Sequence, residues 1–324
     1  MPGDAGHDHV IVGAGLSGLM LARRLLAGPA PATAPTLLLI DPRTTMEHRV
    51  TLAHWARGTT PLDPWAVGSP PEPMTSTSGG RAGGSRRALE LYQTFRGVWV
   101  QSAEPRVDRS AATLLDFSAD DGPDLGFAYV LPVDEHSALV MAVRMGVTTD
   151  LPDPVPAIPR ELGEDGWEVT SEDRGITALT TPAPARRQGR RVLAIGRRGG
   201  RVRASTGYAV TRILADSDAI VSSLHRHGHP FGIPPDPWQD RALDAIWLHA
   251  LAGERAALEP AFLSMFSGVP IDAVLRFLDG RAGAADLTRV VTALPPRPFL
   301  RAAARLAVGR PATARSGETW DDPR

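Results

Sequence analysis

A glycine-rich loop near the start of the chain constrains the fold more than any other feature. The run His9-Val10-Ile11-Val12 leads into this loop, and apolar side chains recur at helical spacing after it. Between a buried parallel strand and a helix, such a loop binds the pyrophosphate of a dinucleotide, because its glycines permit a tight turn and close approach of the phosphates. The helix N-terminus adds N–H groups and a positive dipole. We therefore predict cofactor contacts at Gly13, Ala14, Gly15, Leu16, Ser17 and Gly18.

A second apolar run supports this prediction. Leu37-Leu38-Leu39-Ile40 is typical of a buried strand, and Asp41 follows it directly. An acid in that place suits the ribose hydroxyls of an adenosine. The separation between the glycines and the acid is longer than usual, and a Pro- and Ala-rich loop over residues 28–35 accounts for it. The pattern predicts a nucleotide-binding βαβ unit, and the alternative is a βαβ unit that is only structural.

Composition narrows the classes of protein that fit. The chain has 324 residues, enough for a full core and two lobes, and its net charge of −1 gives no argument for nucleic-acid binding. The absence of cysteine excludes disulfides, thiolate metal sites and a thiol nucleophile. No apolar run has membrane-spanning length and no signal peptide is recognisable, so we expect a cytoplasmic protein. Arginine supplies every basic side chain apart from histidine, which indicates codon bias rather than function.

The rest of the chain divides into strands and then helices. Residues 58–84 are rich in Pro, Gly, Ser and Thr and are typical of a connector. Strands are expected at 89–100, 113–117, 127–132 and 138–145, and the last two are predicted to form a hairpin. A short helix is expected within 156–166. From residue 235 onward we expect only helices, with breaks near Gly253, residues 268–270, Gly280 and residues 295–296.

A late segment favours a flavin. Residues 191–196 are predicted to form another buried strand, followed by a Gly- and Arg-rich loop and a helix that opens at 206–208. In many flavoproteins a late strand returns beside the first one, and the next helix N-terminus faces the flavin. This favours FAD over a nicotinamide cofactor, with contacts at Gly196, Thr206, Gly207 and Tyr208. The loop arginines suit FAD phosphates, an anionic substrate such as a prenyl diphosphate, or solvent; they are Arg197, Arg198, Arg201 and Arg203.

These patterns predict an α/β fold with three parts. A Rossmann-like FAD-binding lobe over residues 1–225 is interleaved with a mixed β-sheet substrate lobe over residues 87–180. A helical C-terminal region follows over residues 226–324.

Several segments match a pattern known from other proteins. They are the first βαβ unit with its LLLIDP run, Phe95-Arg96-Gly97, Leu114-Leu115-Asp116-Phe117, the Tyr129-Val130-Leu131-Pro132 hairpin, the 196–208 segment with its Thr-Gly-Tyr, the 262–280 stretch and Pro295-Pro296. In these segments, which cover nearly the whole chain, the sequence resembles the FAD-binding bacterial lycopene β-cyclases. The Thr-Gly-Tyr segment and the Arg-Phe-x-x-Gly within 262–280 are more specific than the glycine loop.

The resemblance implies a flavoprotein that does no net redox chemistry. In that family, reduced FAD supports a proton-initiated ring closure at the end of a linear polyene. A proton adds to an alkene, the carbocation closes a ring, and a proton leaves. This chain departs from the family in two ways. Met141 stands at the position of the family's catalytic Glu, with Ala142 beside it, and the stretch from Asp41 to Phe95 is much shorter.

Because methionine donates no proton, an active enzyme needs another acid, and Asp116 is the first candidate. It lies in an apolar strand, where burial would raise the pKa of its carboxyl; a structural hydrogen-bond acceptor is the alternative. Met141 either lines a pocket or belongs to an ordinary core face with Leu139, Val143 and Met145. We predict no metal site, since the alternating histidines lack a carboxylate at helical spacing; they are His225, His227 and His229.

We therefore expect a lycopene-cyclase-like flavoprotein that cyclises a linear isoprenoid chain in carotenoid or terpenoid biosynthesis. The alternatives are an FAD-dependent oxidoreductase or monooxygenase, and a catalytically impaired relative that acts as a binding protein. The absent Glu, the short lobe and an aromatic content of 6% favour the last of these. The expected partner is an apolar isoprenoid substrate, without nucleic acid. Amphipathic segments 271–278 and 299–308 carry arginines, and they either pack on the FAD lobe or touch the inner face of a membrane.

Overall fold

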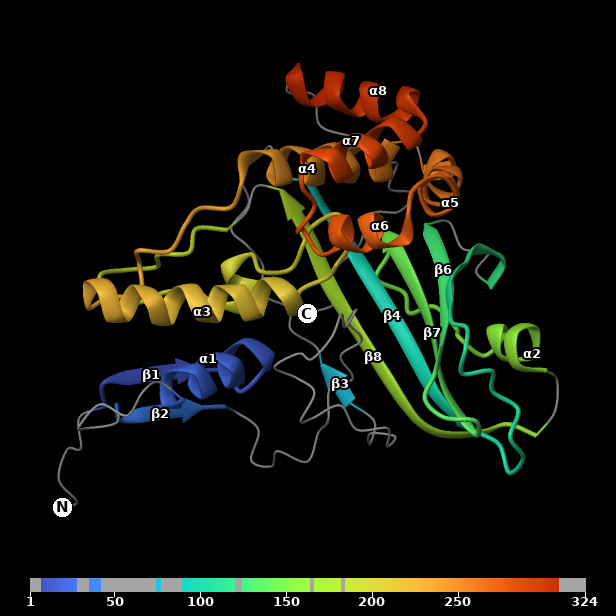
Figure 1. Cartoon of the computed structure of the whole chain (residues 1–324), viewed down its shortest axis with the longest axis horizontal. Helices are drawn as coiled ribbons and strands as arrows, with labels where there is room; N and C mark the ends of the chain where they lie inside the picture. The colour runs from blue at the N-terminus through green and yellow to red at the C-terminus, as the bar shows by residue number, and fades with distance from the viewer. Residues whose placement is uncertain are drawn as a thin grey trace, which may run out of the picture.

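The structure is a computed structural model, and it describes residues 7–27, 35–41, 74–76, 89–119, 124–163, 166–181, 184–253 and 255–308. Figure 1 shows three parts: a small βαβ unit with a long helix on it, a large sheet, and helices that cover the sheet. This arrangement confirms the predicted α/β class. The connector at 58–84 and the loop at 28–35 lie mostly outside the described residues.

The first part is the predicted βαβ unit. Strands β1 (His9–Val12) and β2 (Leu37–Ile40) pair in parallel, and α1 (Leu16–Leu26) connects them. Helix α3 (Val210–His227) packs on α1. An apolar cluster joins these elements, with Ile11, Leu21, Ala22 and Ile220 at its centre. Burial of this cluster fixes α3, which comes late in the chain, to the first strand and helix.

The prediction that β1 and β2 are fully buried is wrong for one of their faces. Val12 is 74% exposed and Val10 is 55% exposed, while Ile11 between them is buried. Successive side chains of a strand point to opposite faces. Among the described residues, α1 and α3 cover only the face that Ile11 occupies.

The second part is a six-stranded sheet in the order β3-β8-β4-β7-β6-β5. Its strands are β3 (Met74–Ser76), β4 (Leu89–Gln101), β5 (Thr113–Asp116), β6 (Leu125–Pro132), β7 (Ser137–Gly146) and β8 (Glu168–Thr181). All neighbours are antiparallel except the parallel pair β3–β8, so the sheet is mixed, as predicted. The predicted hairpin is β6–β7, and its strands pair in register from Leu125–Met145 to Pro132–Ala138.

Strand β8 was not predicted from the sequence. Its buried positions alternate strictly, but they are mostly polar or glycine: Ser171, Asp173, Gly175, Thr177 and Leu179. Sequence patterns find strands by alternating apolar residues, and this buried face has none until its last member. The sequence signal that could have indicated β8 is the alternation of small and polar residues on this face.

The third part is a layer of helices. These are α4 (Trp238–Gly253), α5 (Leu258–Gly268), α6 (Ile271–Leu278), α7 (Ala284–Ala293) and α8 (Pro296–Ala307), and the short turn η4 (Arg255–Ala257) connects α4 and α5. Two further short turns, η2 (Phe117–Ala119) and η3 (Gly196–Gly199), lie outside this layer. The breaks fall at the glycines and prolines that predicted them. The predicted short helix is α2 (Ala157–Leu162), and it lies on the other side of the sheet.

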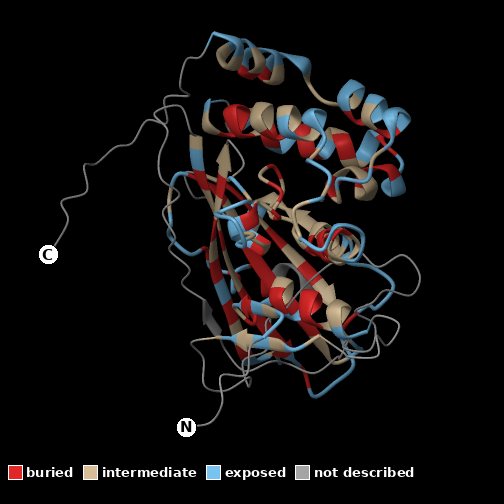
Figure 2. Ribbon diagram, turned by 90° about the vertical axis from the view of Figure 1, so that its left-hand side faces the viewer, coloured by how far each residue is buried: buried red, intermediate tan, exposed pale blue. Residues whose placement is uncertain are grey.

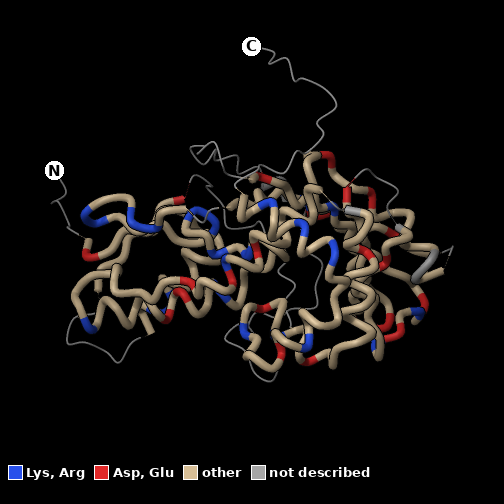
Figure 3. The backbone as a smooth tube through the Cα atoms, turned by 90° about the horizontal axis from the view of Figure 1, so that it is seen from above, with Lys and Arg blue, Asp and Glu red and all other residues tan. Residues whose placement is uncertain are grey.

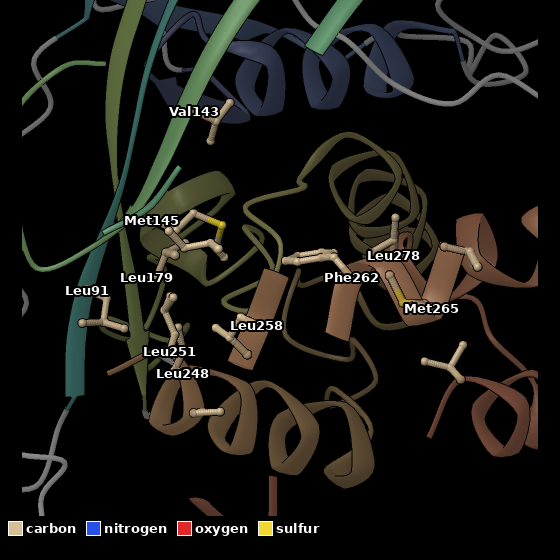
Figure 4. Packing of buried hydrophobic residues seen from close by; sticks show 14 of the residues in the cluster. Leu91, Val143, Met145, Leu179, Leu248, Leu251, Leu258, Phe262, Met265 and Leu278 are labelled. Carbon is tan, nitrogen blue, oxygen red and sulfur yellow. The ribbon is translucent and has the colours of Figure 1, made fainter. Parts of the chain in front are cut away.

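The sheet is buried on both faces, as the red strands of Figure 2 show. One core lies between the sheet and the helical layer. In Figure 4, Leu91 and Leu179 of the sheet lie opposite Leu248 of α4 and Phe262 of α5. A second core on the other face includes Val98, Val140 and Ile158 of α2. Burial on both sides explains why β7 is apolar almost throughout.

None of the described helices is long and apolar enough to cross a membrane.

Candidate functional site

The glycine loop has the geometry of an anion site. Gly13 has φ of +104°, which suits glycine, and a Cβ at Gly18 would collide with the carbonyl of Gly13. Added Cβ atoms at Gly13 and Gly15 would meet no described heavy atom within 4 Å. Helix α1 begins after Gly15, and no side chain caps it in the described structure. The backbone N–H groups of its first turn therefore suit a phosphate, and the loop fits a dinucleotide.

Asp41 is fixed against this loop. The Ala14 N–H donates to Oδ2 of Asp41 at 2.6 Å, and the Gly13 N–H donates to the Ile40 carbonyl at 2.7 Å. The second strand thus ends with its carboxylate beside the glycines, as its place in the sequence suggested. Contact of Asp41 with a ribose stays a prediction.

The late loop, which comprises residues 196–208, lies beside the glycine loop. Gly196 has φ of +57°, and an added Cβ there would come within 2.6 Å of the Ser17 hydroxyl. Two segments that the sequence assigned to one cofactor, and that are far apart along the chain, are therefore neighbours in space. Contacts of Gly196 and Ser17 with the cofactor itself stay predictions.

The predicted strand at 191–196 is wrong. The structure shows only an isolated bridge between Arg187 and Leu193, and β1 pairs with β2 alone among the described strands. Leu193 and Ile195 pack into the cluster of Ile11 and α3, whereas Val192 is 58% exposed. The apolar residues serve this packing rather than a ladder of backbone hydrogen bonds.

Two arginines of the late loop are buried and form ion pairs within the protein. Arg201 donates two hydrogen bonds to the Asp236 carboxylate, at 3.0 and 2.7 Å. Arg203 donates one hydrogen bond to Asp244 at 3.1 Å. Both side chains are buried. They fix the loop to α4 and to the segment before it, which is neither the phosphate contact nor the solvated loop considered above. Figure 3 shows basic and acidic residues intermixed over the described chain.

The Thr-Gly-Tyr segment touches the sheet. Gly207 has φ of +72°, and a Cβ there would overlap the side chain of Gln93 on β4. Tyr208 packs into the core between the sheet and the helices. Helix α3 begins two residues later, at Val210, close to the predicted start. A flavin contact of Thr206, Gly207 or Tyr208 stays a prediction.

Asp116 ends β5 and forms a local turn. Its Oδ1 accepts a hydrogen bond from the Ser118 N–H at 2.9 Å and another from the Ser118 hydroxyl. Asp116 pairs with Ala128, which pairs with Ala142, and Ala128 belongs to the core on the α2 side. Since directly paired residues share a face, Asp116 and Met141 lie on opposite faces of the sheet. The catalytic role of Asp116 stays a prediction.

Met141 lies in a cross-strand row of four residues. Tyr129 pairs with Met141, Met141 pairs with Gly97, and Gly97 pairs with Asp173. The Tyr129 hydroxyl donates to the Met141 sulfur, and a Cβ at Gly97 would lie 2.8 Å from the Met141 methyl carbon. The end of the residue-141 side chain therefore lies above β4, on the face toward the helical layer.

Asp173 is the functional candidate that sequence reasoning missed. The residue is 5% exposed, on the buried face of β8 that also carries Ser171, Gly175 and Thr177. Burial raises the pKa of the Tyr129 hydroxyl, and the charges of Tyr208 and Asp173 add to this effect. A buried carboxyl beside tyrosines, in a layer that excludes water, can hold and transfer a proton.

Aromatic rings line the same layer. Phe117, Phe127 and Phe262 have ring centroids 6.0 to 6.4 Å apart, and Trp247 lies 5.0 Å from Phe262. The chain is poor in aromatic residues, but it gathers them on the helix side of the sheet. Their π-faces suit a cation.

The chain is also similar to known proteins. The family model described as Lycopene cyclase protein matches residues 71–304. A lycopene beta-cyclase from Pantoea ananas is 25% identical over 239 residues, which are 69% of this chain. The chain spans 62% of the length of that curated relative.

Solved structures align less closely. A triple mutant of the flavin-dependent brominase Bmp2 covers 65% of this chain and 56% of its own, with a TM-score of 0.37 and 14% identity. A geranylgeranyl bacteriochlorophyll reductase-like protein from Thermoplasma acidophilum covers 65% and 54%, with a TM-score of 0.32 and 10% identity. The family match is the stronger finding, because it takes in the large sheet, the late loop and nearly all of the helical layer. This chain belongs to the lycopene cyclase family.

Proposed function

We propose that this chain is a flavoprotein that cyclises the end of a linear isoprenoid without net redox change. The observation that carries the proposal is the family match over residues 71–304. The site supports it, because a dinucleotide loop and an aromatic-lined, apolar layer occur in one molecule. The chain spans 62% of the length of its curated relative, and the activity of that whole protein is proposed for this chain.

The residues that would hold FAD are the glycine loop from Gly13 to Gly18, Asp41 and the late loop from Gly196 to Tyr208. The first-turn N–H groups of α1 suit the pyrophosphate, and Asp41 suits the adenosine ribose. When bound in its reduced form, the flavin supplies electron density that stabilises positive charge nearby.

The protein side chains account for the rest of the chemistry. A proton adds to the terminal alkene, the resulting carbocation forms a carbon–carbon bond, and a proton leaves a neighbouring carbon, so no oxidant or reductant is consumed. The apolar core between the sheet and the helices excludes water that would capture the cation. Phe127, Phe262 and Trp247 offer their rings to it.

The substrate class follows from the same layer. Leucines, methionines and aromatic rings favour a hydrocarbon chain over a polar ligand. Such a substrate resides in a membrane, and α6 and α8 expose Ile271 and Leu300 beside arginines. We propose that these helices provide a peripheral contact with a membrane surface.

A binding protein is the second candidate, and Met141 favours it. Without a carboxyl at position 141, the chain would hold an isoprenoid without closing its ring. In this case flavin and isoprenoid bind but no product forms.

The test is an anaerobic assay of the purified chain with FAD, dithionite and lycopene. We expect a yellow protein with bound oxidised flavin, cyclic product only with reduced flavin, and no net consumption of reductant. A Gly15→Val variant, which obstructs the phosphate site, serves as the flavin-free control. Stoichiometric flavin and lycopene without cyclic product would establish the binding protein instead.

A further inference from the structure

We propose that Asp173 is the general acid of the cyclisation, in place of the carboxyl that position 141 lacks. This assignment rests on the proposed function above. It adds a residue and a strand, β8, that no sequence motif indicated.

The cross-strand row places Asp173 beside the end of the residue-141 side chain. Asp173 and Met141 flank Gly97, one on each neighbouring strand, and all three share the face toward the helical layer. Because Gly97 has no side chain, the Met141 methyl group extends over it. A carboxyl at 141 and the carboxyl of Asp173 would therefore reach the space above Gly97 from opposite sides, with strands about 4.8 Å apart.

The next row holds polar atoms that the described residues leave unpaired. Trp99 pairs with Ser171, and neither the Trp99 indole N–H nor the Ser171 hydroxyl has a hydrogen-bond partner among the described residues. Both residues are more than nine-tenths buried and lie on the same face as Asp173. A buried donor and hydroxyl of this kind mark a place for a small polar group such as water. Beside Asp173, that group would hydrogen-bond the carboxyl and fix its orientation.

The tyrosines complete the surroundings of Asp173. Tyr129 is in the same row, and Tyr208 comes from the late loop. The raised pKa of Tyr129 keeps its hydroxyl protonated, so it acts as a hydrogen-bond donor and not as a competing base.

Asp173 both gives the proton that starts the reaction and accepts the proton that is released at the end. The protonated Asp173 carboxyl gives its proton to the alkene, and the carboxylate that remains offsets the charge of the carbocation. After the ring closes, the carboxylate takes a proton from a neighbouring carbon and returns to its first state. Bonds and electrons balance without an added oxidant or reductant.

The first experiment compares Asp173→Asn with the matched control Glu172→Gln. Glu172 immediately precedes Asp173 on β8 and lies on the opposite face, where it forms a salt bridge with Arg96 at 3.0 Å. We expect the Asn variant to lose about 100-fold or more of the cyclisation rate with flavin binding unchanged, and the control to keep the wild-type rate. A smaller loss than in Asp116→Asn would overturn the assignment.

Restoring the family's acid provides a rescue. In an Asp173→Asn background, Met141→Glu places a carboxyl over Gly97, and we expect at least a tenfold recovery of the rate. Asp173→Glu, which keeps the acid, should stay active and controls for folding. An inactive Asp173→Glu that binds flavin, together with a failed rescue, would contradict the proposal.

A binding measurement separates this assignment from the proposed function. N,N-dimethyldodecylamine carries a cation on an alkyl chain, and its neutral counterpart ends in a tert-butyl group. Quenching of tryptophan fluorescence should show that the amine binds about tenfold more weakly to Asp173→Asn, while the neutral compound binds equally well. Equal amine affinities would overturn the role of Asp173 even if wild-type protein makes cyclic product. Absence of product from wild type would instead count against the cyclase.

Discussion

Gly97 shows how one missing side chain shapes the site. The Met141 methyl group occupies the space that a Cβ at Gly97 would take. Because Met141 also accepts the Tyr129 hydrogen bond, three strands are packed together at this point. The glycine is thus a packing requirement of β4, in addition to its place in the family-like Phe-Arg-Gly segment.

Gly97→Ala tests that packing. We expect a loss of about 1–3 kcal/mol in the free energy of unfolding, because the new methyl group forces Met141 out of place. Urea unfolding measures it. In a Met141→Ala background the same substitution should cost much less, and equal costs in the two backgrounds would contradict the contact.

Tyr129 makes the stability of the folded protein depend on pH in the alkaline range. Burial, with Tyr208 and Asp173 nearby, raises its pKa above the ordinary value of 10.0. The folded protein therefore holds this proton more tightly than the unfolded chain, and the stabilisation present below pH 10 is lost as the pH rises further. We expect the urea midpoint of Tyr129→Phe to fall less than that of wild type between about pH 9 and about pH 11. Parallel decreases in the two proteins would argue against a buried phenol.

At the scale of elements, the glycine loop separates two functions of glycine. A Cβ at Gly18 collides with the protein itself, whereas one at Gly15 points into open space. We expect Gly18→Ala to destabilise the βαβ unit and to lose flavin. Gly15→Ala should keep the far-ultraviolet circular dichroism and thermal midpoint of wild type while its bound flavin absorbance drops. Full flavin binding by Gly15→Ala would contradict a phosphate site at this loop.

The late loop depends on buried ion pairs for its position. Arg203 is 3% exposed at its side chain and donates to Asp244 and to the Phe277 carbonyl. Arg203→Ala should cost about 3–5 kcal/mol, since it leaves Asp244 buried without its cation. The exposed pair of Arg24 and Asp218 at 2.7 Å is the control, and Arg24→Ala should cost less than about 1 kcal/mol. Similar costs, from chemical unfolding, would show that the loop is held in another way.

The two strands β7 and β8 show how far sequence reasoning reaches. β7 was predicted because both of its faces are apolar, and β6 followed from its pattern and the turn between them. β8 was missed because its buried face carries Ser171, Asp173 and Thr177, which read as surface residues. The strand expected at 191–196 failed for the opposite reason, because its apolar residues pack without pairing.

The same limit applied to the site. The glycine loop and the late loop could be predicted because each has a local motif, and the structure brings them together. Asp173 could not, because its significance depends on a register across three strands that no single segment contains. A polar residue on a buried face becomes visible only when its neighbours on adjacent strands are known.

On the scale of the whole molecule, the described chain has separate apolar cores. The βαβ unit and α3 share one cluster, and the large sheet contributes to two others. We expect flavin-free protein to unfold in two thermal steps, with the small cluster melting first, because it buries fewer side chains. Added FAD should raise the first step and bring the two together in calorimetry. A single transition without flavin would contradict independent cores.

The separation of the cores also affects which substitutions each part of the chain can accept during evolution. The family match begins at residue 71, so it lies on the sheet, the late loop and the helices rather than on the βαβ unit. Each part keeps its own packing, so substitutions in one are not constrained by the interior of the other. The βαβ unit needs to preserve only its glycine loop and its packing against α3. The sheet and the helices must instead preserve two cores that pack against each other through the same strands, and the family match is found in this part of the chain.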